Sequence, residues 1–162
     1  MTYLAALTIF HTIISIIAMG LGFVVVADLL RGGESRGWMN AFLVTAIATS
    51  VTGFFFPPNG VTPAIVVGVL ALVILAFVLL ARGRASGSAL WRWVYVGGIV
   101  ASTYLLVFVG IAQTFQKVGI LNRLAPTGSE PPFAITQGIT LLIFVVVGIL
   151  ASARYRPSRA MA

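Results

Sequence analysis

Apolar residues form five long runs along the chain, separated by short polar breaks. The runs cover residues 4–26, 38–56, 64–81, 93–115 and 133–151. A helix needs about 20 mostly apolar residues to cross the roughly 30 Å hydrocarbon core of a bilayer. The pattern therefore predicts an all-α integral membrane protein, a bundle of five transmembrane helices that forms a single domain over residues 1–162.

The breaks have the chemistry of turns and loops. Residues 31–37 are charged and rich in glycine, residues 57–60 read Pro-Pro-Asn-Gly, and residues 82–88 are polar. The connection 116–132 is the longest, and its three prolines exclude a continuous helix there. The first apolar run lacks a basic n-region and is too long for a cleaved signal peptide, so we expect a retained helix.

Composition supports lipid as the solvent for most of the chain. Hydrophobic residues make up 60% of the sequence and charged residues only 8%, whereas soluble domains carry about 25% charged residues. A soluble enzyme, a disordered tail and a fibrous repeat are all excluded on this ground. Cysteine is absent, so there are no disulfides, thiolate metal sites or thiol nucleophiles.

The basic residues that give the net charge of +7 lie singly or in small groups between apolar runs. This distribution indicates the orientation of the chain in a membrane and does not indicate nucleic-acid binding. Lys and Arg favour the cytoplasmic side of a membrane. With five helices, eight basic residues fall on one side and two on the other. The eight are Arg31, Arg36, Arg82, Arg84, Arg92, Arg154, Arg156 and Arg159. The prediction is an outside N-terminus and a cytoplasmic C-terminus, with Trp38, Trp91, Trp93 and Tyr155 at the cytoplasmic interface.

Small residues are spaced for close helix packing. Lipid tails are as apolar as leucine, so close backbone contact and interhelical hydrogen bonds must hold the helices together. The pairs Gly97 with Ala101 and Gly98 with Ser102 have this spacing, as do Ala18 and Gly22. Residues 64–80 carry no polar side chain, so this helix is expected at the periphery of the bundle. Asp28 is expected to pair with Arg31, three residues on.

Polar side chains fall at a similar depth in the outer halves of several helices. They are His11, Thr49, Thr52, Gln113, Gln116 and Gln137. Ionisable residues at depth are costly and mark function by default, so we expect a polar layer or shallow outward cavity lined by His11 and the three glutamines. The alternative is a neutral His11 that bonds to a glutamine amide or a carbonyl and fixes helix register.

The loop 116–132 is the second candidate site. Lys117, Arg123 and Glu130 are its charged residues, and Glu130 is expected near one of the two cations. Residues 118–125 are predicted to form a short interfacial helix that ends at Pro126. Ordered loops often carry function, and the alternative is a structural cap over the helix ends.

The same loop carries a resemblance. Gln-Thr-Phe-Gln-Lys at 113–117 and Leu-Ala-Pro-Thr-Gly-Ser-Glu-Pro-Pro-Phe at 124–133, with Thr-Gly-Phe-Phe-Phe-Pro at 52–57, resemble a group of small bacterial integral membrane proteins of no settled activity. The resemblance covers most of the chain. It implies a location in the bacterial inner membrane and no particular chemistry.

Residues for catalysis are sparse. A hydrolase needs a nucleophile, a base and an orienting group, and a zinc site needs three or four ligands, but the chain has one histidine and no cysteine. We therefore expect no enzyme activity and no cofactor. Three hypotheses remain: an oligomeric channel or transporter-like unit for a small solute or ion, an accessory or scaffolding subunit of a larger membrane complex, and a quinone- or haem-binding redox subunit. Under each hypothesis we expect the protein to contact the lipid bilayer and either a second copy of itself or another membrane protein, and not nucleic acid.

Overall fold

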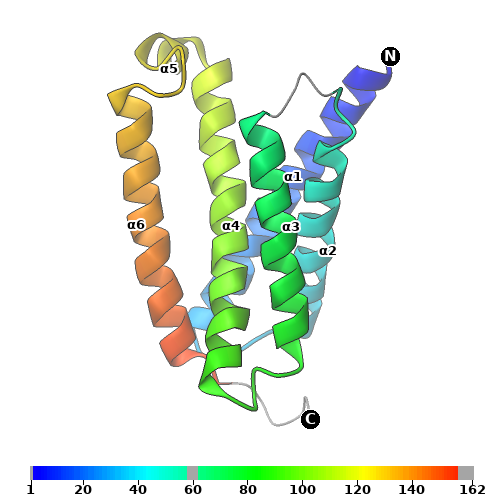
Figure 1. Cartoon of the computed structure of the whole chain (residues 1–162), viewed down its shortest axis with the longest axis vertical. Helices are drawn as coiled ribbons and strands as arrows, with labels where there is room; N and C mark the ends of the chain where they lie inside the picture. The colour runs from blue at the N-terminus through cyan, green and yellow to red at the C-terminus, as the bar shows by residue number, and fades with distance from the viewer. Residues whose placement is uncertain (1, 58–61, 157–162) are drawn as a thin grey trace.

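The computed structural model describes residues 2–57 and 62–156, and in this part of the chain every regular element is a helix (Figure 1). The elements in chain order are α1 (Tyr3–Leu30), α2 (Arg36–Gly53), α3 (Pro63–Arg82), α4 (Ala89–Lys117), α5 (Gly119–Leu124) and α6 (Pro131–Arg154). The all-helical prediction is confirmed.

Four helices, α1, α3, α4 and α6, are long and apolar enough to cross a membrane, as expected of a multi-pass membrane protein. The helix α2 is shorter, at 18 residues, and is less apolar. It carries Arg36, Asn40 and four hydroxyl side chains. It nevertheless lies alongside α1 and α3 within the bundle (Figure 1).

The helix ends differ from the predicted ones. Most helices run past the apolar stretches, with α1 continuing to Leu30 and α4 beginning at Ala89, because polar residues can extend a helix beyond the hydrocarbon core. The second helix ends early, at Gly53, so the phenylalanines at 54–56 lie in a turn. The short helix predicted at residues 118–125 is present as α5. Residues 58–60 of the predicted turn, and Arg159, lie outside the described residues.

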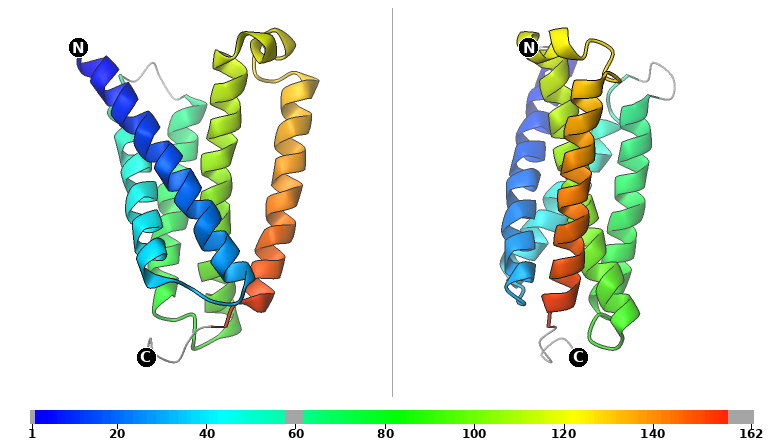
Figure 2. Two further views of the ribbon diagram at one scale, coloured as in Figure 1. Left: turned by 180° about the vertical axis from the view of Figure 1, so that it is seen from behind. Right: turned by 90° about the vertical axis from the view of Figure 1, so that its left-hand side faces the viewer.

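The bundle has two distinct ends. At the N-terminal end α1 and α6 begin, α4 ends and α5 lies; at the C-terminal end lie the loops 31–35 and 83–88 and the end of α6 (Figure 1). The long helix α1 runs obliquely across the others (Figure 2), a tilt that a long apolar stretch adopts to fit a bilayer. The helix α4 is central and packs against α1, α3 and α6. As predicted, α3 is peripheral and packs against α2 and α4.

Glycines allow the closest helix contacts. A Cβ on Gly98 of α4 would lie 2.5 Å from Cγ2 of Val78 on α3. A Cβ on Gly22 of α1 would lie 2.7 Å from Cγ2 of Thr103 on α4. Both partners are fully buried and branched at Cβ, so they cannot rotate away easily. The predicted face of α1 with Ala18 and Gly22 and that of α4 with Gly98 and Ser102 are therefore packing faces, whereas Gly97 and Ala101 line an open groove.

The neighbouring glycines Gly97 and Gly98 provide a matched test of this packing. We expect Gly98→Ala to lower the free energy of unfolding by about 1–3 kcal/mol, because the new methyl group meets the rigid Val78 side chain. Gly97→Ala should be neutral or slightly stabilising, since nothing lies within 4 Å of its Cβ position. Unfolding in detergent, followed by circular dichroism, measures both. Equal destabilisation by the two changes would contradict this packing.

Candidate functional site

The candidate site begins where α1 ends. The N–H groups of Gly32 and Gly33 donate to the carbonyls of Leu29 and Asp28, at 3.0 and 3.1 Å, which is a Schellman motif. Gly32 has a φ of +86°, and a Cβ there would lie 3.1 Å from the carbonyl oxygen of Arg154. Glycine is needed both for this left-handed turn and for the close approach to α6.

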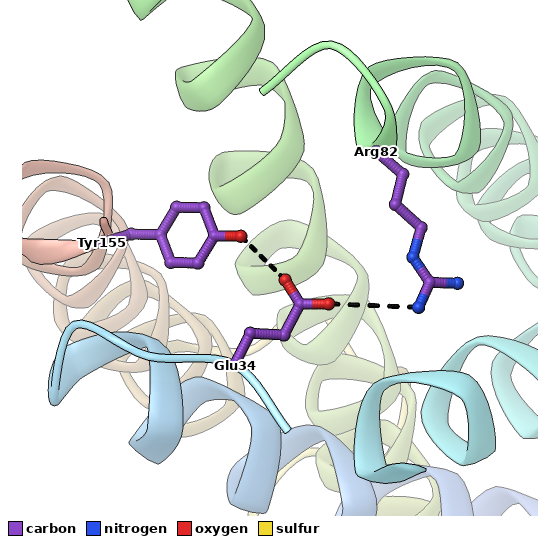
Figure 3. A network of polar contacts seen from close by, with 3 residues as sticks. All are labelled: Glu34, Arg82 and Tyr155. Atoms are coloured by element: carbon purple, nitrogen blue, oxygen red, sulfur yellow. Dashed lines mark hydrogen bonds and ion pairs between the residues drawn. The ribbon is translucent and has the colours of Figure 1, made fainter. Parts of the chain in front are cut away.

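The turn directs Glu34 into the C-terminal end of the bundle (Figure 3). The Tyr155 hydroxyl donates a hydrogen bond to Glu34 Oε2 at 2.8 Å. On the other side, an Arg82 guanidinium nitrogen lies 3.9 Å from Glu34 Oε1. This second distance is too long for a hydrogen bond, so the attraction is coulombic. The Glu34 side chain is only 5% exposed, so these contacts replace much of its hydration.

Tyr95 of α4 completes the cluster. Its ring centroid lies 6.0 Å from that of Tyr155, and its hydroxyl interacts electrostatically with Glu34. We call Glu34, Arg82, Tyr95 and Tyr155 the Glu34 cluster. It links the loop 31–35, the end of α3, the first turns of α4 and the end of α6. The cluster therefore closes the C-terminal end of the bundle.

The protonation of Tyr155 is set by this environment. Burial raises the pKa of the Tyr155 hydroxyl, and the hydrogen bond to Glu34 and the charge of Glu34 raise it further, whereas the charge of Arg82 lowers it. Tyr155 thus stays a hydrogen-bond donor throughout the neutral range. Its contribution to stability is present below the ordinary tyrosine pKa of 10.0 and is lost only as the pH rises above that value.

Polar atoms in and beside the cluster remain unpaired. Glu34 Oε1, the Tyr95 hydroxyl, Arg92 Nε and the Ser152 hydroxyl are buried without a hydrogen-bond partner. Each such group costs about 1–3 kcal/mol. At Glu34 part of this cost is offset by the Arg82 guanidinium, 3.9 Å from Oε1, and by the electrostatic interaction with Tyr95.

The sequence analysis did not find this cluster. Tyr155 was predicted to mark the cytoplasmic interface; the structure shows that its side chain is 1% exposed and turns inward to Glu34. Glu34 was assigned only to a charged turn. In the sequence, Glu34 is a single acid between arginines and next to a Gly-Gly pair, and this pattern does not predict that its side chain is buried. The predicted ion pair of Arg31 with Asp28 is present, at 3.7 Å.

At the other end, His11 bonds to Thr52 instead of a glutamine. His11 Nδ1 lies 2.9 Å from the Thr52 hydroxyl oxygen, which itself donates to the Ala48 carbonyl at 2.8 Å. Since the hydroxyl proton is used within α2, the His11 Nδ1–H is the donor. The His11 ring also makes an edge contact with Phe56, with centroids 5.4 Å apart. This pair links α1 to α2.

The remaining members of the predicted polar layer do not join His11. Gln137 is buried, and its amide donates to the Phe108 carbonyl at 3.0 Å, linking α6 to α4. Gln113 and Gln116 are exposed on α4. Thr49 is buried with an unpaired hydroxyl. The structure therefore brings together only His11 and Thr52 of this group.

A cavity does lie in the N-terminal half of the bundle, but its walls are apolar. It has a volume of about 380 Å³ between α1, α4 and α6. Its lining residues, which we call the groove, are Met19, Val107, Gly110, Ile111, Thr114, Phe115 and Thr136. None of the predicted polar-layer residues is among them. The groove is open along the side of the bundle, and a second apolar groove, of about 250 Å³, lies between α4 and α6 toward the C-terminal end.

The loop 116–132 is ordered around Glu130. The carboxylate accepts hydrogen bonds from the N–H and hydroxyl of Thr127, at 3.0 and 2.8 Å, and from the Ser129 N–H at 3.1 Å. Desolvation acts to raise the pKa of Glu130, but these hydrogen bonds outweigh it and lower the pKa to about 2. The expected pairing of Glu130 with Lys117 or Arg123 is not among the ion pairs of the described residues.

Comparison with known proteins adds no relative. No protein family, no curated protein and no solved structure matches the chain. In the described part of the chain no group of three or more His, Cys, Asp or Glu side chains could hold a metal ion. The candidate sites are thus the Glu34 cluster, the groove and the loop 116–132.

Removing one hydroxyl tests the Glu34 cluster. We expect Tyr155→Phe to lower the free energy of unfolding by about 1.5–3 kcal/mol, because a buried carboxylate loses its one hydrogen bond. Thr8→Val is the matched control, since the Thr8 hydroxyl is exposed and bonds only within α1. Unfolding in detergent measures both variants. A Tyr155→Phe protein as stable as the control would show that the bond contributes nothing.

Acid titration tests the order of the loop. The folded-state pKa of Glu130 is lowered, so the order it gives is present above the ordinary value of 4.5 and is lost as the pH falls toward about 2. A nitroxide on a cysteine introduced at Leu124 should become mobile across this interval. In Glu130→Gln, the mobility should be high and independent of pH. A wild-type spectrum that stays constant to pH 2 would refute the assignment.

Proposed function

We propose that this protein is a non-enzymatic, transporter-like unit of the bacterial inner membrane. In this proposal all five long helices cross the bilayer, with α2 as the fifth span, the N-terminus outside and the C-terminal end in the cytoplasm. The basic loops of the C-terminal end and the resemblance of the loop 116–132 to small bacterial membrane proteins support this placement.

The single observation that carries the proposal is the asymmetry between the two ends. At the C-terminal end the Glu34 cluster ties the loop 31–35 to α3, α4 and α6, beside a smaller groove of about 250 Å³ between α4 and α6, whereas the N-terminal half holds the groove of about 380 Å³. Closure at one end with a cavity toward the other is the arrangement expected of alternating access. Breaking the Glu34 contacts would open the closed end.

The lining of the groove supports an apolar or amphiphilic solute and not an ion. Its walls are mostly aliphatic and aromatic, and the glutamines expected to face it lie elsewhere. Five helices are few for a monomeric transporter built on paired repeats, so the functional unit is proposed to be a homo-oligomer.

The accessory-subunit hypothesis has support of its own in α6. Only 6% of the apolar stretch of α6 is buried. Ile139, Leu142 and Val146 are among its exposed side chains. A partner helix could cover this face. Purification from native membranes tests this second function: a stable stoichiometric partner that is lost in Leu142→Asn would favour it.

A chain without cysteine allows a direct test of alternating access. Single cysteines at Ser152, one turn before Tyr155, and at Thr114, in the groove, report on the two ends. We expect Glu34→Gln to raise the rate at which a membrane-impermeant thiol reagent modifies the cysteine at 152 by about tenfold. The loss of one buried charge interaction, of about 1.4 kcal/mol, corresponds to this factor.

The cysteine at 114 should react more slowly in the same variant, because opening of one end closes the other. A cysteine at Leu124, which is exposed on α5 in the loop 116–132 outside the spanning helices, is the control and should react at an unchanged rate. Faster reaction at 152 without slower reaction at 114 would mean local loosening and would overturn the transporter proposal.

A further inference from the structure

The groove offers its occupant no free side-chain hydrogen-bonding group. Its two polar residues are threonines whose hydroxyls donate within their own helices, Thr114 to the Gly110 carbonyl and Thr136 to the Pro132 carbonyl, both at 2.8 Å. The remaining walls are Met19, Phe115 and aliphatic groups of α4. The part of a ligand that enters this groove must therefore be hydrocarbon.

A positively charged side chain, that of Lys117, lies beyond the groove toward the N-terminal end of the bundle. The residues of α4 that line the groove recur at helical spacing: Val107, Gly110, Ile111 and Thr114. Lys117 is the next member of this series, three residues after Thr114, so it lies on the same face of α4 one turn further on. Helical spacing thus places the lysine just beyond the groove, whose lining along α4 ends at Phe115.

The positive charge beyond this end of the groove is uncompensated within the described residues. Lys117 and Arg123 are both exposed, and neither takes part in an ion pair there. The only acid of this end, Glu130, is bound to Thr127 and Ser129 in its own loop. Asp28 and Glu34 lie at the opposite end of the bundle. An apolar groove with a cation just beyond one end is complementary to a ligand with a hydrocarbon chain and an anionic head.

We propose that the groove binds one acyl chain of an anionic phospholipid, with the lipid phosphate at Lys117. The proposal builds on the function above by naming the ligand class of the groove, but binding requires no opening of the Glu34 cluster. A lipid is the ligand favoured here because, in the proposed topology, the groove faces the bilayer and Lys117 lies near the level of the headgroups.

Photo-crosslinking can locate the chain. The full-length protein is reconstituted with phosphatidylglycerol or phosphatidylcholine that carries a diazirine in one acyl chain, and adducts are mapped by mass spectrometry. We expect phosphatidylglycerol adducts on α1 near Met19 and on α4 between Val107 and Phe115. Lys117→Gln should reduce the preference for phosphatidylglycerol over phosphatidylcholine by about fivefold.

Two matched pairs of variants control the experiment. Gly110→Leu fills the groove and should abolish the adducts, whereas Gly138→Leu, at a position with nothing within 4 Å of its Cβ, should keep them. Arg31→Gln removes an exposed charge at the opposite end and should leave the preference unchanged. Circular dichroism confirms that each variant is folded.

Uniform adducts on all lipid-facing helices, or adducts unchanged in Gly110→Leu, would overturn the groove as a lipid site. Equal labelling by the two lipids would overturn the role of Lys117. If no adducts form in the groove but the cysteines at 114 and 152 change reactivity in opposite directions, the transporter proposal is supported and the lipid site is contradicted. If adducts form in the groove but the two cysteines do not change reactivity in opposite directions, the lipid site is supported and the transporter proposal is contradicted.

Discussion

The burial of one carboxylate, that of Glu34, organises the C-terminal end of this bundle. Apolar burial cannot drive helices together in lipid, so polar links and close packing must do so. Glu34 reaches Tyr155 and Arg82 from a loop between the first two helices. A charge withdrawn from water is tolerated only when it is paired. The loop, α3, α4 and α6 must therefore meet at this point, and the Gly32 turn places Glu34 where they can.

The rest of the bundle is held differently, and this explains its asymmetry. Toward the N-terminal end, helices are linked in pairs: His11 joins α1 to α2, and Gln137 joins α4 to α6. No such bond between α1 and α6 is found in the described residues, and the groove lies where these two helices and α4 meet. The helices around the groove are thus joined by separate pairwise links, whereas those at the C-terminal end share one cluster.

Much of the fold could be predicted from hydrophobicity, whereas the site could not. Apolar runs long enough to span a bilayer located the helices, and proline and glycine located the breaks between them. The approximate depth of a side chain follows from its position in a run, which is why Gln113, Gln116 and Gln137 were expected together. Its direction follows only if the rotation of the helix is known. Gln113 and Gln116 share a face of α4 that turns outward, whereas Gln137 of α6 is buried, and the sequence does not distinguish these rotations.

The Glu34 cluster could not be predicted for a related reason: its main hydrogen bond joins residues 121 positions apart, and every loop at this end of the bundle carries arginine that could pair with Glu34. Its polar atoms are also incompletely hydrogen-bonded: of the seven buried polar side-chain atoms without a hydrogen-bond partner among the described residues, four lie at this end. Each unsatisfied group costs stability. At Glu34 part of this cost is offset by charge, because the Arg82 guanidinium lies 3.9 Å from the same oxygen and the Tyr95 hydroxyl interacts electrostatically with Glu34. The cluster is therefore held by coulombic attraction as well as by its hydrogen bond.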